Sequence, residues 1–217
     1  MRRAAMALVL LVLLVLAGCG QQERPYSPGG EPSAGGGGTA RAAAPETTPD
    51  ETTPDETAAA EDGKQTVTMG GGRFRVEIDW PAERDPLVKL MAGYMVAMRK
   101  ALVAGDERYL RDVEFELSAA PAAYDWLKYH TDREQTVRGV TRLYDLRVAA
   151  KMGKGAQVNV CVDETGARVV SSRTGKAVSP RPSWVRAPYL QALIAHRGDD
   201  GVWRIRGIRY DLKGCPA

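Results

Sequence analysis

The sequence predicts an α+β domain in which helices near the start of the domain pack on one face of a curved antiparallel sheet. Apolar residues between Pro86 and Leu102 recur every three or four positions, as on one face of a helix. From Val140 onward the apolar period is two, which is typical of strands. Because these later segments follow one another with short turns, they favour an antiparallel meander over alternating strand–helix units.

The domain begins with two segments that predict a hairpin. Val67–Met69 and Phe74–Trp80 alternate between apolar and polar residues, and Gly70–Gly72 supplies the turn between them.

A capped helix follows the predicted hairpin. Asp85 suits the cap position and Pro86 the first helical position, where its missing N–H group needs no partner. Gly105 is a natural end, and Asp106 can cap a shorter helix that carries Leu110. The apolar stripe of the long helix consists of Leu87, Leu90, Met91, Tyr94, Met95, Met98 and Leu102. Its methionines favour core packing against a sheet, with an adaptable binding groove as the alternative.

The rest of the domain is predicted as one more helix and five strands. The helix runs from Ala119 to about His130, with Tyr124, Trp126 and Leu127 packing inward. One side of a long strand is formed by Val140, Arg142, Tyr144, Leu146, Val148 and Ala150, and one side of the next by Val158, Val160 and Val162. A third strand, Arg168–Ser171, follows the turn Glu164–Gly166, and a final hairpin joins Tyr189–Arg197 to Val202–Tyr210 through Gly198–Gly201.

The first 18 residues have the pattern of a secretory signal. Arg2 and Arg3 precede an apolar stretch of about 15 residues, which is short of the roughly 20 that a spanning helix needs. The stretch ends in Leu16-Ala17-Gly18-Cys19, which resembles the lipobox of bacterial lipoproteins. The resemblance implies cleavage between Gly18 and Cys19 and attachment of diacylglycerol, with fatty acids such as palmitate, to the thiol of Cys19. An ordinary secretory signal with a chance cysteine and an uncleaved membrane anchor are the alternatives.

Residues 19–64 have the composition of a disordered linker between the lipidated cysteine and the globular domain, residues 65–217. The linker is rich in Pro, Thr and Gly and repeats a five-residue unit from Pro45 to Thr57. From Gly20 to Lys64 it carries nine acidic and three basic residues, whereas the domain has a net charge of +7. A basic domain could meet anionic headgroups or anionic wall polymers. Alternatively, the arginines are scattered over the domain and only keep it soluble. The excess of arginine over lysine is typical of a high-GC genome, so it does not by itself indicate a function.

Between Pro86 and Cys215 the domain resembles the nuclear transport factor 2-like superfamily, and small exported lipoproteins that carry such a domain. The resemblance rests on the helix with Tyr94 and Ala97, on Ala104-Gly105-Asp106 and Leu110, on Val160-Cys161-Val162-Asp163, on Thr174-Gly175-Lys176, and on Gly201-Val202-Trp203-Arg204-Ile205. It implies a cone-shaped half-barrel with a pocket between sheet and helices. The N-terminal hairpin is a departure from the pattern of the family.

Two cysteines remain once Cys19 is assigned to lipid. Cys161 lies in a predicted strand and Cys215 near the C-terminus, and outside the membrane such a pair indicates a disulfide. A metal site or a reactive thiol is the alternative. A metal site needs more ligands than these cysteines and the two distant histidines, His130 and His196, so we expect no metal and no cofactor.

The resemblance also suggests where to look for chemistry, because members of the superfamily that isomerise or cyclise substrates place an Asp or His in the cone. Asp145 is the candidate acid–base residue if its side of the strand faces the pocket, and the alternative is an exposed strand aspartate. His130 and His196 lie at element ends, where surface positions are common. No phosphate loop, nucleophile elbow or nucleic-acid-binding pattern is present.

The sequence therefore favours an exported lipoprotein that is lipid-anchored at the extracytoplasmic face of the cell membrane. Its domain is expected to be a non-catalytic module for ligand binding or protein interaction at the cell envelope. The expected partners are the lipid bilayer through diacylglyceryl-cysteine and an envelope protein, an anionic polymer or a small apolar ligand. The alternative is a pocket enzyme of the polyketide cyclase or isomerase type.

Overall fold

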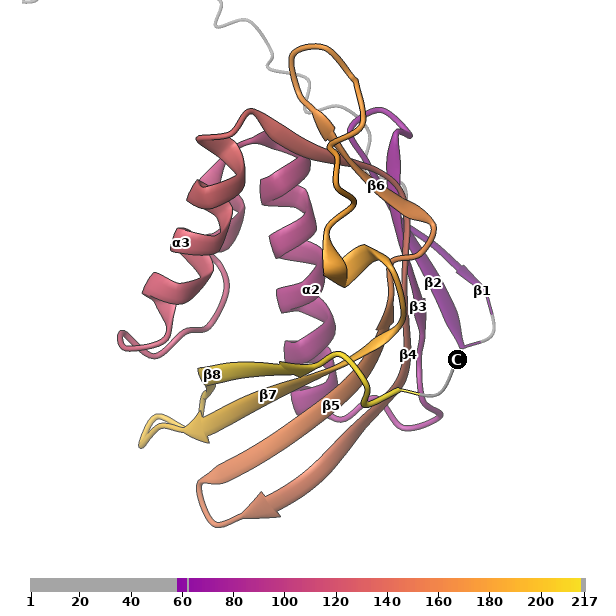
Figure 1. Cartoon of the computed structure of the whole chain (residues 1–217). Coiled ribbons are helices and arrows are strands. Elements are labelled where there is room, and N and C mark those ends of the chain that lie inside the picture. Colours follow the sequence, from indigo (N-terminus) through magenta and orange to yellow (C-terminus); the bar gives the residue numbers. More distant parts are fainter. Residues whose placement is uncertain (1–57, 62, 216–217) are drawn as a thin grey trace, which may run out of the picture. The chain divides into compact units, whose positions relative to one another are not determined.

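The structure is a computed structural model that describes residues 58–61 and 63–215 (Figure 1). The predicted signal peptide, its cleavage between Gly18 and Cys19, the lipidation of Cys19 and the linker up to residue 57 lie outside the described residues. Within the described part, no helix is both long enough and apolar enough to cross a membrane.

Helices and strands follow one another as predicted, from a hairpin through helices to a meander. The helical elements are α2 (Pro86–Ala104), α3 (Ala120–Thr131) and the short 3-10 helices η1 (Glu107–Leu110) and η2 (Ser183–Val185). The strands are β1 (Ala58–Glu61), β2 (Lys64–Met69), β3 (Phe74–Asp79), β4 (Gln135–Met152), β5 (Gly155–Asp163), β6 (Ala167–Ser171), β7 (Tyr189–Arg197) and β8 (Trp203–Asp211).

The strands form one curved sheet in the order β1-β2-β3-β4-β5-β7-β8, with β6 paired to β4. The sheet bends around α2, and α2 and α3 lie on the same face of it (Figure 1). This arrangement confirms the predicted α+β fold class. The first strand, β1, pairs with β2 and belongs to the segment whose composition indicated a linker. The sheet therefore begins before Gln65.

One strand pair departs from the predicted antiparallel sheet, because β3 and β4 run parallel, with Phe74 opposite Gly139. Parallel neighbours need a long crossover connection. Here the connection contains α2, η1 and α3, which carry the chain back along one face of the sheet before β4 begins. The helices that precede the meander thus make the sheet mixed.

The predicted caps of α2 and η1 are confirmed. The Asp85 side chain accepts a hydrogen bond from the Leu87 amide at 2.7 Å, and Gly105 ends α2 with a left-handed φ of 67°. The Asp106 side chain accepts from the Arg108 amide at 2.8 Å. Met91, Met95 and Met98 are all buried, as core packing predicts, but Met95 and Met98 also line a pocket, as the groove alternative predicts.

The predicted face of β4 is wrong for the first half of the strand. Val137, Thr141 and Leu143 are buried, whereas the predicted inward residues Val140, Arg142 and Tyr144 are exposed or half-buried. The register with β5 shifts between Tyr144 and Arg147, and Asp145 lies in this bulge with a φ of +52°. A bulge inserts one residue and so turns the following side chains to the opposite face.

After the bulge, Leu146 is buried, as predicted, but Ala150 is exposed beyond a second shift in register between Val148 and Ala150. The expected faces of β5 and the expected β7–β8 hairpin are also confirmed. Cys161 and Cys215 form a disulfide with Cα atoms 5.8 Å apart, so the end of the described chain is bonded to β5. Among the residues described, no group of three or more His, Cys, Asp or Glu side chains is placed to hold a metal ion.

Candidate ligand-binding site

A pocket of about 450 Å³ lies between α2, α3, η2, β7 and β8. Its volume is within the range of sites for small organic ligands. The aromatic wall residues are Tyr94, Trp126, Trp184, Tyr189 and Tyr210, and the aliphatic ones include Met95, Met98, Ile208 and Leu212. The polar wall residues are Ser118, Ser183, Gln191, Arg99 and Arg206.

Local periodicity brings these side chains to the pocket. Tyr94 and Met98, like Met95 and Arg99, are four residues apart on α2 and so lie on one face of the helix. The alternation of β8 turns Ile208 and Tyr210 toward the pocket together, and Leu212, just past the end of the strand, also lines it.

Arg99 is the buried charge on the pocket wall. The residue is 5% exposed, and its Nε and Nη2 atoms both lie 2.7 Å from Oε1 of Glu164. Its guanidinium carbon also lies 5.4 Å from the ring centroid of Trp126 and 5.5 Å from that of Trp184. Cation–π attraction to both rings therefore adds to the ion pair.

Glu164 is fully buried behind Arg99, and its carboxylate accepts hydrogen bonds from three side chains, that of Arg99 among them. The Thr141 hydroxyl donates to Oε1 at 2.8 Å, and the Tyr189 hydroxyl donates to Oε2 at 2.9 Å. In the described part of the chain, no buried side-chain nitrogen or oxygen lacks a partner. The charge of Arg99 is thus balanced inside the protein, with the complete hydrogen bonding that a buried ion pair requires.

The two buried tyrosines of the wall are held in their protonated form. Burial raises the pKa of Tyr94 to about 12, against the opposing effects of Arg99 and of a hydrogen bond with Gln191. Burial and the neighbouring Glu164 raise the pKa of Tyr189 well above its usual value. Neither phenol can therefore act as a base at neutral pH, and the Tyr189 hydroxyl already donates its proton to Glu164.

His130 was expected at the surface, but it is buried at 4% exposure and supports the pocket wall from behind. Its ring packs against Trp126 and Trp184, at centroid distances of 4.6 Å and 6.2 Å. Its Nδ1 lies 2.8 Å from Oε1 of Gln135, which joins the end of α3 to the start of β4. Burial lowers the pKa of His130 below its usual value, so the ring is neutral at neutral pH.

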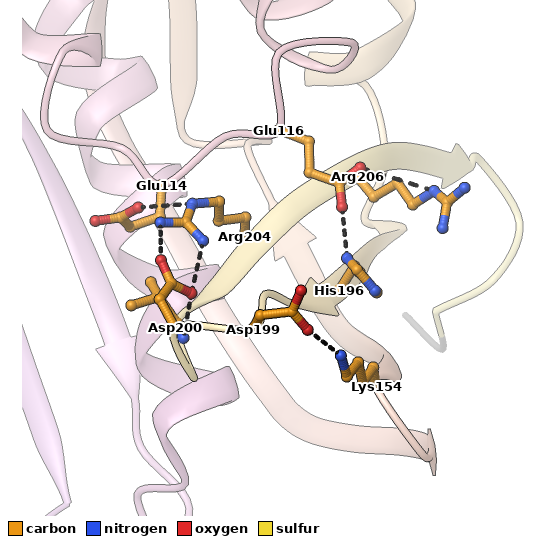
Figure 2. A network of polar contacts seen from close by, with 9 residues as sticks. Glu114, Glu116, Lys154, His196, Asp199, Asp200, Arg204 and Arg206 are labelled. Atoms are coloured by element: carbon orange, nitrogen blue, oxygen red, sulfur yellow. Dashed lines mark hydrogen bonds and ion pairs between the residues drawn. The ribbon is translucent and has the colours of Figure 1, made fainter.

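A polar network joins the segment with Glu114 and Glu116 to β7 and β8 (Figure 2), and this segment leads to Ser118 on the pocket wall. The Ile205 amide donates to the Glu114 carbonyl at 2.7 Å, and the Glu116 amide donates to the Ile205 carbonyl at 2.9 Å. The Glu116 carboxylate lies 2.8 Å from Nδ1 of His196 and 3.8 Å from Nε of Arg206. His196 therefore belongs to this half-exposed network rather than to the pocket wall.

The candidate acid–base residue Asp145 does not reach the pocket. Its side chain is 52% exposed and pairs with Arg147 two residues along β4. Among the described residues that line the pocket, none is Asp, Glu, His, Lys or Cys. The exposed-aspartate alternative for Asp145 is the one that the structure supports.

Arg99 and Glu164 are the buried charged residues of the site that sequence reasoning missed. Arg99 follows Met95 by four residues and so places a charge on the apolar stripe of α2, which is a signal that the stripe faces something polar. Glu164 gives no comparable signal, because a carboxylate in a predicted turn is ordinarily solvated.

Comparisons with known proteins give structural likeness at low identity. No protein-family model and no curated protein matches the chain. A Novosphingobium aromaticivorans protein provisionally named an aromatic ring hydroxylase shares 14% identity at a TM-score of 0.42, over 59% of this chain and 91% of its own. A Shewanella frigidimarina protein provisionally named a ketosteroid isomerase shares 11% identity at a TM-score of 0.33, over 57% of this chain and 92% of its own. An uncharacterised Caulobacter vibrioides protein with a cystatin-like fold shares 17% identity at a TM-score of 0.38, over 58% of this chain and 86% of its own. We draw no conclusion about activity from these similarities.

Proposed function

We propose that the domain binds a small, largely apolar ligand in the pocket between α2, α3, β7 and β8, without changing it chemically. One observation carries this proposal: the described pocket wall consists mainly of aromatic, aliphatic and neutral polar side chains, its buried arginine is balanced by Glu164, and its other arginine, Arg206, is exposed. Apolar walls with a few placed polar groups are characteristic of sites that hold small molecules.

A cyclase or isomerase would need a group on the pocket wall that exchanges protons near neutral pH. Asp145 pairs with Arg147 away from the pocket, and the pKa of each buried wall tyrosine is raised. These observations favour binding over acid–base catalysis.

The ligand-binding proposal is tested by filling the pocket with a bulky side chain. Ala122 lines the pocket from an exposed position on α3, so Ala122→Trp should block the pocket without disturbing the core. Tyr129→Trp is a matched control, because Tyr129 is 53% exposed on the same helix and does not line the pocket.

The probe is N-phenyl-1-naphthylamine, an uncharged dye that becomes fluorescent in apolar sites. We expect saturable binding to the wild type and to Tyr129→Trp, and at least tenfold weaker binding to Ala122→Trp. Equal binding by the wild type and Ala122→Trp, or no saturable binding by the wild type, would overturn the proposal.

We also propose that the domain is held at the extracytoplasmic face of the cell membrane by lipid on Cys19. The support is the sequence alone: a basic start, an apolar stretch too short to span a bilayer, and Leu16-Ala17-Gly18-Cys19. The Cys19→Ala variant should move from the membrane fraction to the soluble fraction, and globomycin should block processing of the wild type. Unchanged fractionation of Cys19→Ala would refute the anchor.

A further inference from the structure

The pocket contains an arginine whose charge is already paired with a carboxylate inside the protein. A guanidinium on the wall of an apolar pocket is ordinarily the partner of a carboxylate or a phosphate, because its N–H groups fit those oxygens in pairs. Two of the nitrogens of Arg99 already lie 2.7 Å from the Glu164 carboxylate, and Trp126 and Trp184 lie against the guanidinium.

The pair is locked from the side that faces away from the pocket. Glu164 is fully buried and takes further hydrogen bonds from Thr141 and Tyr189, so it cannot turn away to make room for a second anion. Exchanging it for a ligand carboxylate would leave Glu164 buried without its cation, which is strongly unfavourable.

A carboxylate placed in the pocket beside Arg99 would thus share one guanidinium with Glu164 in a site with little water. Two like charges that share a buried site repel each other strongly. An uncharged ligand of the same shape meets no such repulsion and can still hydrogen-bond the Tyr94 hydroxyl or Gln191 on the wall.

We infer that the pocket selects uncharged ligands over anionic ligands of the same shape, and that Glu164 sets this selectivity through Arg99 without touching the ligand. The inference rests on the proposed function, since it concerns the same pocket. It makes Glu164 a positioning residue, and it names the ligand class as neutral, largely apolar molecules.

The second cation of the wall does not alter this selectivity. The Arg206 side chain is 63% exposed at the pocket mouth and lies 3.8 Å from the Glu116 carboxylate. Water and the nearby carboxylate screen its charge, so it adds little preference for an anion.

The test compares 2-naphthamide with 2-naphthoate, which have nearly the same shape and differ in charge at pH 7.5. Both are titrated calorimetrically into the purified full chain, with empty detergent micelles as the reference. We expect the amide to bind the wild type at least tenfold more tightly than the carboxylate. Glu164→Gln keeps the shape of the side chain and removes its charge, so it should shift the ratio at least tenfold toward the carboxylate. Arg209→Gln, which removes an exposed charge of β8 that does not line the pocket, should leave the ratio unchanged.

The outcomes separate the inference from the proposed function. If the wild type binds both compounds equally, or the carboxylate more tightly, the inference fails while ligand binding in the pocket stands. If neither compound binds, and the naphthylamine dye does not bind either, the proposed function fails. If the dye binds but neither compound does, the assignment of the ligand class fails alone. If Glu164→Gln does not fold, the ratio of amide to carboxylate affinity in the wild type decides whether the inference holds. Thr141→Val is then the milder variant: it removes one hydrogen bond to Glu164 but keeps the charge of Glu164, so this ratio should not change.

Discussion

Replacing Cys215 by alanine should lower the free energy of unfolding by about 4 kcal/mol. The disulfide joins residues that are 54 apart in the sequence, and in the chain-entropy model a closed loop of this length restricts the unfolded chain by about that amount. Cys215 is the better residue to replace, because Cys161 is only 2% exposed in β5 and its thiol can remain there as a small apolar group.

Urea unfolding followed by circular dichroism, with and without a reductant, measures this effect. The reductant should shift the wild type toward the stability of Cys215→Ala and should leave the variant unchanged. The exported wild type should titrate with no free thiol from Cys161 or Cys215, and the variant with one. A loss of less than about 1 kcal/mol would refute the entropic reasoning, and two free thiols in the exported wild type would refute the disulfide itself.

Three further changes test the core and the pocket. Burial lowers the pKa of His130, so the unfolded chain takes up a proton before the folded protein does, and the free energy of unfolding should fall as the pH drops below about 6.5. His130→Gln should flatten this part of a plot of urea midpoint against pH. The same pH dependence in the variant and the wild type would contradict a role for His130. Arg99→Met leaves Glu164 buried without its cation and should lower the free energy of unfolding in urea by about 3–5 kcal/mol. The double variant Arg99→Met with Glu164→Gln should regain part of this stability. A loss of less than about 1 kcal/mol in Arg99→Met would refute the buried pair. Gly139→Ala should lower stability in thermal unfolding by more than about 3 kcal/mol, because φ is +106° and the new methyl group meets a backbone carbonyl. The control Gly71→Ala, at φ +64° with open space around it, should lower stability by only about 1–2 kcal/mol. Equal losses in the two variants would show that the close approach at Gly139 is absent.

Local chemistry made the helix ends and turns predictable. Asp85 and Gly105 act within a few residues of themselves, as a side-chain cap and a left-handed turn, so the bounds of α2 follow from the sequence. The β7–β8 hairpin is equally local, since its turn residues lie between the two strands that they join.

The inward face of β4 could not be predicted in the same way. A period of two assigns faces only while the strand is regular, and the bulge at Asp145 exchanges the two faces midway. The same bulge places Asp145 at an exposed position beside Arg147 and away from the pocket wall.

By itself the sequence determined the fold class, the ends of α2, the β7–β8 hairpin and the residues that could form a disulfide. Each of these depends on neighbouring residues or on composition. The tertiary structure alone decided the character of the pocket, because Arg99 and Glu164 are 65 residues apart and meet only when α2 packs on the sheet. The hydrogen bonds and burial that make this pair neutral belong to the packed state, and no pattern along the chain expresses them.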